Sequence, residues 1–549
     1  MKPERAGLVV CLLATVLLTA PFCGKAFHID DPFYIRIAQH ITQHPLDYYG
    51  LTLNWYGRAI PVHAMHVSPP LVPYYLAAWG AVFGWGEVSL HLSFLPFALL
   101  FVGSTYSLAS YCCRSQVLAA LLTLCAPVTV VTAGNIMLDL PMSAFFTAAI
   151  AAWCAGMQRN RTGLLVAAGV FAGLSALSKY FGLSLVPLLF VYTLASRNRP
   201  AFWPFALCIP LLCFGIEQAC NYTLYGHSVF ANAGVIAREA QTFNQTSVVQ
   251  RGLSGLSFTG GCLFPLLACG IHMLPNRRRL LTIAPLCAIA ACTTACTVWM
   301  LPNGVTLPAL SLAQLALFSC GGVVLAALVL DEVRQSRSPE TVLLVCWTAG
   351  TFVFATAMNW SVTARTILPM APAVALLITR RIERARPTVE KRWTTLLAAA
   401  ACAVLALCVG IADYTWAASA RDAAFRFAAQ ARQQRGTVRF QGHWGWQYYM
   451  ELQGFDSVEI DKLVYKPGDF VISPENNSNV APLPEQFVYG VQTTEIATSR
   501  WVATNSRELG AGFYSNSWGP LPFAFGKVAP DRYHVLLLGP PRGGAPVSR

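Results

Sequence analysis

Three aspartates lie beside apolar stretches of this chain, where acidic side chains are rare. Asp30 and Asp31 are adjacent and follow the first apolar run, and Asp139 lies within Met137-Leu138-Asp139-Leu140-Pro141 at the start of another. A carboxylate can take the proton of a hydroxyl group that lies within hydrogen-bond reach. We therefore expect Asp30 or Asp31 to act as a catalytic base, and Asp139 to orient a substrate or to bind a cation.

Two cations complete the set of residues that could do chemistry. Lys179 interrupts a long apolar segment within Ser178-Lys179-Tyr180, and Arg365 precedes a further apolar run. Fixed Lys and Arg side chains stabilise the negative charge that develops on a leaving phosphate. The two residues therefore predict a site for a phosphate-bearing substrate.

The aspartate pair also has a purely structural interpretation. Asp30 or Asp31 could cap the helix that follows, whose Phe33, Ile37 and Ile41 fall on one face at helical spacing. Two adjacent carboxylates are more than one cap needs, which favours chemistry for at least one of them.

The other three charges have structural alternatives as well. Asp139 could cap its own helix and interact with the positive end of that helix dipole. Lys179 and Arg365 could simply extend from helix ends toward water. Ionisable groups near lipid are nevertheless costly, so all are candidate functional positions.

The composition shows what must hold these residues in place. Of 549 residues, 55% are hydrophobic and 11% are charged, against about 25% charged in a soluble domain. Apolar runs of the length that crosses a membrane recur from Gly7 to about Trp416. About thirteen spans are expected, at residues 7–24, 88–110, 115–133, 138–157, 162–178, 180–195, 202–220, 258–275, 280–301, 309–330, 341–358, 366–380 and 393–416.

The run from Gly163 to Ala195 is too long for one span, and we expect it to break at Ser178-Lys179-Tyr180. With that break, the Arg-rich loops all fall on one side, as expected of cytoplasmic loops. The five candidate residues then share the opposite, outer face. Lys2 and Arg5 precede a first helix that we expect to remain uncleaved.

The net charge of +13 does not indicate a nucleic-acid partner, because the Lys and Arg residues lie in short loops and form no single patch.

The first outer loop, at about residues 28–87, is expected to lie along the membrane surface. Its Tyr56, His66 and Tyr74 are candidate substrate contacts. The histidines of the loop could bind a divalent metal, but their spacing matches no zinc pattern. We therefore expect no required cofactor.

Several segments resemble a known family. They are DDPFYIRIAQHI, NWYG, SPPLVPYYLAA and HLSFLPF in the stretch 28–95, MLDLPMSAFF around Asp139, LSKYFGL around Lys179 and ARTILP around Arg365. In type and order they resemble the bacterial branch of the dolichyl-phosphate-mannose protein mannosyltransferase superfamily, whose relatives include the ArnT-like aminoarabinose transferases.

The resemblance implies a GT-C fold and an inverting transfer of a sugar from a polyprenyl-phosphate donor. The family's Asp-Glu pair maps onto Asp30 and Asp31, so the second member here is one methylene shorter. Metal-binding relatives carry a Glu just before the Pro-Pro pair, where this chain has His66-Val67-Ser68. That difference argues against a metal requirement.

The tail at 417–549 is expected to form a separate soluble α/β domain. Val438-Arg439-Phe440, Asp469 to Ile472 and Tyr533 to Leu537 are predicted strands, and Trp444 to Leu452 is a predicted helix. The aromatic residues of Gly442-His443-Trp444-Gly445-Trp446 could stack on a sugar, but a packed core is the better interpretation.

Together these observations predict an all-α membrane domain of GT-C type at 1–416 with a C-terminal α/β domain. The expected function is sugar transfer from a polyprenyl-phosphate donor to a lipid, glycan or protein acceptor, on the outer face of a bacterial inner membrane. The N-terminus would be cytoplasmic and the tail periplasmic. A transporter or flippase is the alternative, and an inactive scaffold a third; no internal repeat is visible to favour transport.

Overall fold

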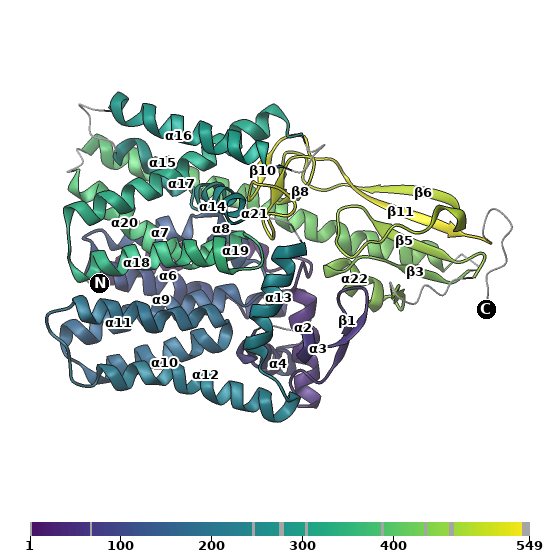
Figure 1. Cartoon of the computed structure of the whole chain (residues 1–549), viewed down its shortest axis with the longest axis horizontal. Helices are drawn as coiled ribbons and strands as arrows, with labels where there is room; N and C mark the ends of the chain where they lie inside the picture. The colour runs from purple at the N-terminus through teal and green to yellow at the C-terminus, as the bar shows by residue number, and fades with distance from the viewer. Residues whose placement is uncertain are drawn as a thin grey trace.

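The computed structural model (Figure 1) describes most of the chain. The described residues are 3–65, 68–243, 247–273, 279–301, 306–385, 389–432, 436–459 and 466–540. A helical bundle fills one end of the molecule, and the strands of the C-terminal region lie at the other (Figure 1). The mostly helical fold with a strand-containing C-terminal region agrees with the predicted class.

The bundle is built from apolar helices that are long enough, alone or in pairs, to reach across it. They are α1 (Pro3–Thr19), α6 (Leu95–Cys112), α7 (Gln116–Leu124), α8 (Pro127–Ala133), α9 (Asp139–Arg159), α10 (Thr162–Ser178), α11 (Leu185–Ala195), α12 (Trp203–Tyr225), α14 (Val248–Cys262), α15 (Pro265–Met273), α16 (Arg279–Trp299), α17 (Ala309–Gln335), α18 (Pro339–Val353), α20 (Ala371–Arg384) and α21 (Val389–Ala431).

Within the described residues, seven helices are long and apolar enough to cross a membrane, or eight if α7 and α8, which meet at a bend of 63°, form one span. Shorter apolar helices, among them α10 and the stretch Tyr180–Ala195, accompany them. The chain is therefore a multi-pass membrane protein by length and composition, and the count of thirteen spans stays a prediction.

The predicted break at Lys179 is confirmed. Helix α10 ends at Ser178, Lys179 is extended, and the short helix η2 (Tyr180–Ser184) leads into α11. Gly182 allows η2 to fold back on α10, since a Cβ there would lie 2.4 Å from the carbonyl carbon of Ser175. The break places Lys179 at the end of α10.

The first loop forms a layer across one end of the bundle. It contains α2 (Asp31–Gln43), β1 (Thr52–Asn54), β2 (Ala59–Pro61), α3 (Val62–Met65), α4 (Leu71–Phe83) and α5 (Glu87–Leu92). Helix α2 and helix α13 (Val229–Phe243) run across the direction of the bundle helices, between the bundle and the strands (Figure 1). Phe33, Ile37 and Ile41 are buried on one face of α2, as their spacing predicts.

The C-terminal region carries a five-stranded sheet in the order β4-β3-β5-β11-β6. Its strands are β3 (Val438–Phe440), β4 (Asp456–Ser457), β5 (Phe470–Pro474), β6 (Val488–Ile496) and β11 (Asp531–Leu538). Strands β3 and β5 are parallel, and β11 is antiparallel to β5 and β6. The predicted strands and the helix α22 (Trp444–Leu452) are all confirmed, and the buried Trp446 packs on Phe440 and Tyr533 as a core residue.

The C-terminal region packs directly on the first loop. The Tyr449 hydroxyl on α22 accepts a hydrogen bond from the backbone N–H of Phe27 at 2.8 Å. Gly445 permits this approach, because a Cβ there would lie 2.0 Å from the carbonyl oxygen of Phe27. Helix α21 runs without interruption through the predicted boundary at 416/417 to Ala431, so a continuous helix joins the two predicted domains.

Candidate active site

Four charged side chains from distant parts of the sequence meet where the first loop covers the bundle. Arg365 Nη1 lies 2.9 Å from Asp30 Oδ2 and 3.8 Å from Asp139 Oδ2. Lys179 Nζ lies 2.7 Å from Asp139 Oδ1. The predicted site residues Asp30, Asp139, Lys179 and Arg365 are therefore brought together in one cluster of alternating charge.

The two adjacent aspartates face different surroundings. Asp30 precedes α2, but its side chain makes no capping hydrogen bond and is directed to Arg365, with 27% of the side chain exposed. Asp31 is fully buried and accepts hydrogen bonds from the backbone N–H groups of His28 (2.9 Å) and Ile136 (2.8 Å). Of the two, Asp30 is the more accessible, while Asp31 ties the first loop to the segment before α9.

The burial of Asp31 also changes its acidity. Desolvation raises the pKa of Asp31 to about 7, although the charge of Lys25 and the two backbone N–H groups lower it. Asp31 is therefore partly protonated at neutral pH, and its predicted catalytic role stays a prediction.

Asp139 is the first residue of α9 and has almost no exposed side-chain surface. It lies between the two cations, so each of its carboxylate oxygens faces a positive charge. Lys179 retains 26% exposure of its side chain, enough for the ammonium group to reach a ligand at the surface of the cluster.

Arg365 is held by a short helix, α19 (Ala364–Ile367). Thr363 and Thr366 form a reciprocal capping box that fixes the start of this helix. Burial alone would lower the pKa of Arg365, but the charges of Asp30 and Asp139 raise it above its ordinary value. The buried Nε of Arg365 has no hydrogen-bond partner in the part of the chain that the structure describes, so this donor is available to a ligand.

Two of the predicted substrate contacts, Tyr56 and Tyr74, lie in different surroundings. Tyr56 is 50% exposed. Partial desolvation and the negative charge of Asp30 raise the pKa of its hydroxyl group, which indicates that Tyr56 lies near the cluster. The Tyr74 hydroxyl donates to the carbonyl oxygen of Pro45, and the Tyr74 ring packs near Tyr48. Among the described residues, Tyr74 makes no contact with the four charged side chains of the cluster. His66 lies outside the described residues.

The histidines of the first loop are not gathered around one point. His28 Nε2 lies 3.8 Å from Asp413 Oδ1, whereas the His63 ring stacks on Tyr225. Over the described ranges, no group of three His, Cys, Asp or Glu side chains is close enough to hold a metal ion. A metal requirement is therefore left untested.

A buried ion pair that sequence reasoning missed lies behind the cluster. Lys25 Nζ contacts Asp413 Oδ2 on α21, and both side chains are 2% exposed. Lys25 also donates to Asn135, and Asp413 accepts from the hydroxyls of Thr504 and Tyr514. The signal was present in the sequence, because Asp413 is an acidic residue inside an apolar run and such residues usually have a partner.

Arg251 is a second residue that the sequence analysis overlooked. It lies on α14, which packs against α19, and is 3% exposed. Its Nε and Nη1 have no hydrogen-bond partner among the described residues. A buried guanidinium without a carboxylate is costly, which indicates a position suited to an anionic ligand.

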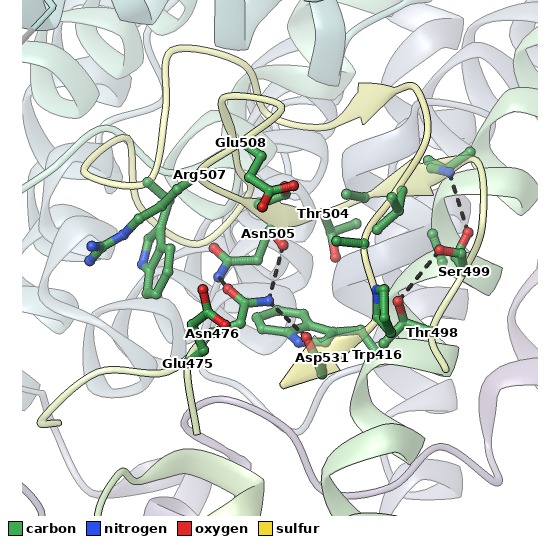
Figure 2. Close-up of a pocket in the computed structure, with 18 of the residues that line it drawn as sticks. Trp416, Glu475, Asn476, Thr498, Ser499, Thr504, Asn505, Arg507, Glu508 and Asp531 are labelled. Atoms are coloured by element: carbon green, nitrogen blue, oxygen red, sulfur yellow. Dashed lines mark hydrogen bonds between the residues drawn. The ribbon is translucent and has the colours of Figure 1, made fainter. Parts of the chain in front are cut away.

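A pocket of about 710 Å³, part of it open to solvent, lies apart from this cluster in the C-terminal region (Figure 2). Its polar side chains are largely bonded to one another. Asn476 Nδ2 donates to Asp531 Oδ1 at 3.2 Å and to the carbonyl oxygen of Asn505 at 3.3 Å, and Asn505 donates back to Asn476 at 3.0 Å (Figure 2). None of the four charged cluster residues lines this pocket, so it gives no evidence on the chemistry.

Residues 67–215 match the model of the dolichyl-phosphate-mannose-protein mannosyltransferase family. The matched segment contains Asp139 and Lys179, while Asp30 and Arg365 lie outside it. No curated protein sequence matches the chain.

Two solved structures illustrate the fold. ArnT from Cupriavidus metallidurans, solved with undecaprenyl phosphate, is 15% identical over 85% of this chain and 93% of its own, with a TM-score of 0.53. AglB, the oligosaccharyltransferase of Archaeoglobus fulgidus, solved with an inhibitory peptide and a dolichol-phosphate, is 14% identical over 86% of this chain and 69% of its own, with a TM-score of 0.49. At these sequence identities the similarity shows the fold alone.

Over residues 67–215 the matched family model confirms the predicted resemblance to the superfamily of protein mannosyltransferase-like and ArnT-like proteins. The solved ArnT structure has a similar fold, that of the GT-C superfamily.

Proposed function

We propose that this protein transfers a sugar from a polyprenyl-phosphate-linked donor to a hydroxyl or phosphate group of a lipid, glycan or protein acceptor, with inversion at the anomeric carbon. The observation that carries the proposal is the cluster in which Asp30 and Asp139 meet Lys179 and Arg365 on a GT-C fold. Such a cluster offers both a proton acceptor and cations for a phosphate.

Asp30 is the proposed base. Its carboxylate is the more exposed of the two in the cluster and is not used for capping. It takes the proton of the acceptor as the acceptor oxygen attacks the anomeric carbon, while Asp139 orients the acceptor. A single displacement of this kind inverts the anomeric configuration.

The cations act on the leaving group. As the bond between the anomeric carbon and the phosphate oxygen breaks, the polyprenyl phosphate gains negative charge, which Lys179 and Arg365 stabilise. The unpartnered Nε of Arg365 and the buried guanidinium of Arg251 supply further donors. ArnT of Cupriavidus metallidurans was solved with undecaprenyl phosphate, which supports a polyprenyl phosphate as the leaving group here.

Each cation of the cluster is paired with an aspartate, Lys179 with Asp139 and Arg365 with Asp30. A bound phosphate would compete for Arg365 and Lys179, and the exchange of partners would free Asp30 for the acceptor. The proposed steps use no metal.

We propose that the cluster faces the outside of a bacterial inner membrane. The opposite end of the bundle carries Arg380 and Arg384, which pair with the buried Glu332 of α17, and Arg381, which pairs with Asp331. This concentration of arginines is typical of a cytoplasmic end. It would leave the C-terminal region periplasmic.

Turnover of a defined donor tests the proposal. Purified full-length protein in detergent is supplied with synthetic polyprenyl-phosphate sugars and candidate acceptors, with and without a chelator. We expect release of polyprenyl phosphate, a product of inverted anomeric configuration by NMR, and no loss of rate with the chelator. Retained configuration would rule out the single displacement. Absence of turnover, together with flux of an intact lipid-linked substrate by the protein reconstituted in liposomes, would favour a transporter.

A further inference from the structure

The segment that carries Arg365 is bound to the C-terminal region. The backbone N–H of Ala364 donates to the carbonyl oxygen of Phe513 at 2.8 Å. Val362 and Asn516 form a reciprocal pair, in which the Val362 N–H donates to the Asn516 side chain and the Asn516 N–H donates to the Val362 carbonyl, both at 2.9 Å. Arg365 is thus attached to a part of the chain about 150 residues further on.

Tyr514 lies at the centre of this attachment and is 5% exposed. The guanidinium carbon of Arg365 lies 5.6 Å from the centroid of its ring, within the range in which a cation is attracted to an aromatic face. The Tyr514 hydroxyl donates to Asp413 Oδ2 at 2.8 Å and accepts from Asn135 Nδ2 at 3.0 Å. Two hydrogen bonds of its hydroxyl group therefore fix the Tyr514 ring beside Arg365.

We propose that Tyr514 is a positioning residue, whose ring holds the guanidinium of Arg365 where the donor phosphate binds. The C-terminal region then completes the site, because the membrane helices alone do not supply this support. The inference rests on the proposed function, since it concerns the donor phosphate of that reaction.

The need for such support follows from the arginine side chain. A free arginine has many rotamers, and a guanidinium that must exchange Asp30 for a phosphate works best when it is already oriented. Besides the Tyr514 ring, Arg365 Nη1 contacts Met137 Sδ at 2.9 Å. Asn135, which donates a hydrogen bond to the Tyr514 hydroxyl, is two residues from Met137. The two contacts of Arg365, with the Tyr514 ring and with Met137, are therefore linked through the segment 135–137.

Binding of undecaprenyl phosphate to the full-length protein in detergent tests the inference without requiring an acceptor. The variants are Tyr514→Leu and Tyr514→Phe, and the control is Tyr533→Leu, a buried tyrosine of the C-terminal core that does not contact Arg365. Loss of a cation–aromatic contact predicts about 2- to 30-fold weaker binding for Tyr514→Leu. Tyr514→Phe keeps the ring but loses the two hydrogen bonds of the hydroxyl group, so its binding should weaken less than that of Tyr514→Leu.

The Tyr514→Leu substitution in an Arg365→Gln protein distinguishes a loss of positioning from a general loss of stability. In Arg365→Gln there is no cation for the ring to hold, so adding Tyr514→Leu should weaken binding no further. An equal loss in both backgrounds, or unchanged binding in Tyr514→Leu, would overturn the inference while leaving the proposed function intact. A wild-type protein that neither binds undecaprenyl phosphate nor transfers a sugar would remove the proposed function, and this inference with it.

If Tyr514→Leu does not fold, the Val362–Asn516 pair provides the test. Asn516→Ala removes the acceptor for the Val362 N–H, whereas Asn516→Asp retains an acceptor oxygen. We expect binding to weaken about 2- to 10-fold in the first variant and to recover in the second. Equal affinities in Asn516→Ala and wild type would overturn the inference.

Discussion

The buried carboxyl of Asp31 makes the stability of the protein depend on pH in an unusual direction. Its pKa in the folded protein is about 7, against 3.8 for the free group. Between these values the unfolded chain has lost the proton and the folded protein retains it. Stability from this group is therefore complete below about pH 4 and is lost as the pH rises through 7.

The size of the effect follows from the pKa difference of about three, which corresponds to about 4 kcal/mol. Asp31→Asn removes the titration. It also turns an amide N–H₂ toward one of the two backbone donors, His28 N–H or Ile136 N–H, which should cost about 1–3 kcal/mol. The variant should therefore melt below wild type at about pH 4, where the stability from protonated Asp31 is complete, and the gap should close or reverse by pH 8.

Thermal unfolding in detergent, followed by tryptophan fluorescence at several pH values from 4 to 8, measures this gap. Gly490→Ala changes no titratable group and has room for the added carbon, whose nearest neighbour would be Leu537 Cβ at 3.8 Å, so it controls for the rest of the protein. A gap between wild type and Asp31→Asn that stays constant across this range would refute the reasoning.

Three further predictions concern the surroundings of the cluster. Asp413→Asn leaves the Lys25 ammonium group without its charged partner and should destabilise the protein by about 3–5 kcal/mol. The double variant Lys25→Met, Asp413→Leu should recover much of the melting temperature. Equal melting temperatures of the single and double variants would count against a coupled pair. Gly445→Ala should lower the melting temperature because its Cβ would overlap the Phe27 carbonyl oxygen, while Gly490→Ala should not. Arg251→Leu should leave the melting temperature unchanged or raise it, because it removes an unpartnered buried guanidinium, and it should weaken binding of undecaprenyl phosphate. A less stable variant with normal binding would contradict an anion-binding role.

Much of the secondary structure could be predicted from local patterns. Lys179 marked the end of α10 because an apolar run of that length cannot be one span. The tail strands and α22 could be predicted because alternation and turn residues are local signals. The four clustered charges were found because ionisable groups at the ends of apolar runs are rare.

The remaining features depend on long-range contacts that no local pattern contains. The difference between Asp30 and Asp31 arises because the N–H of Ile136, 105 residues away, points at Asp31 and not at its neighbour. The partner of Asp413 lies 388 residues away at Lys25. Tyr514 is an ordinary tail aromatic until the fold brings it to Arg365.

The central claim is that Asp30 takes the acceptor proton. The most direct measurement is transfer of labelled sugar from a synthetic polyprenyl-phosphate donor by wild type, Asp30→Asn and Asp47→Asn, an exposed aspartate of the same loop. We predict that Asp30→Asn loses about 10²- to 10⁴-fold in kcat while still binding undecaprenyl phosphate, and that Asp47→Asn remains active. Transfer by Asp30→Asn at the wild-type rate would contradict the account.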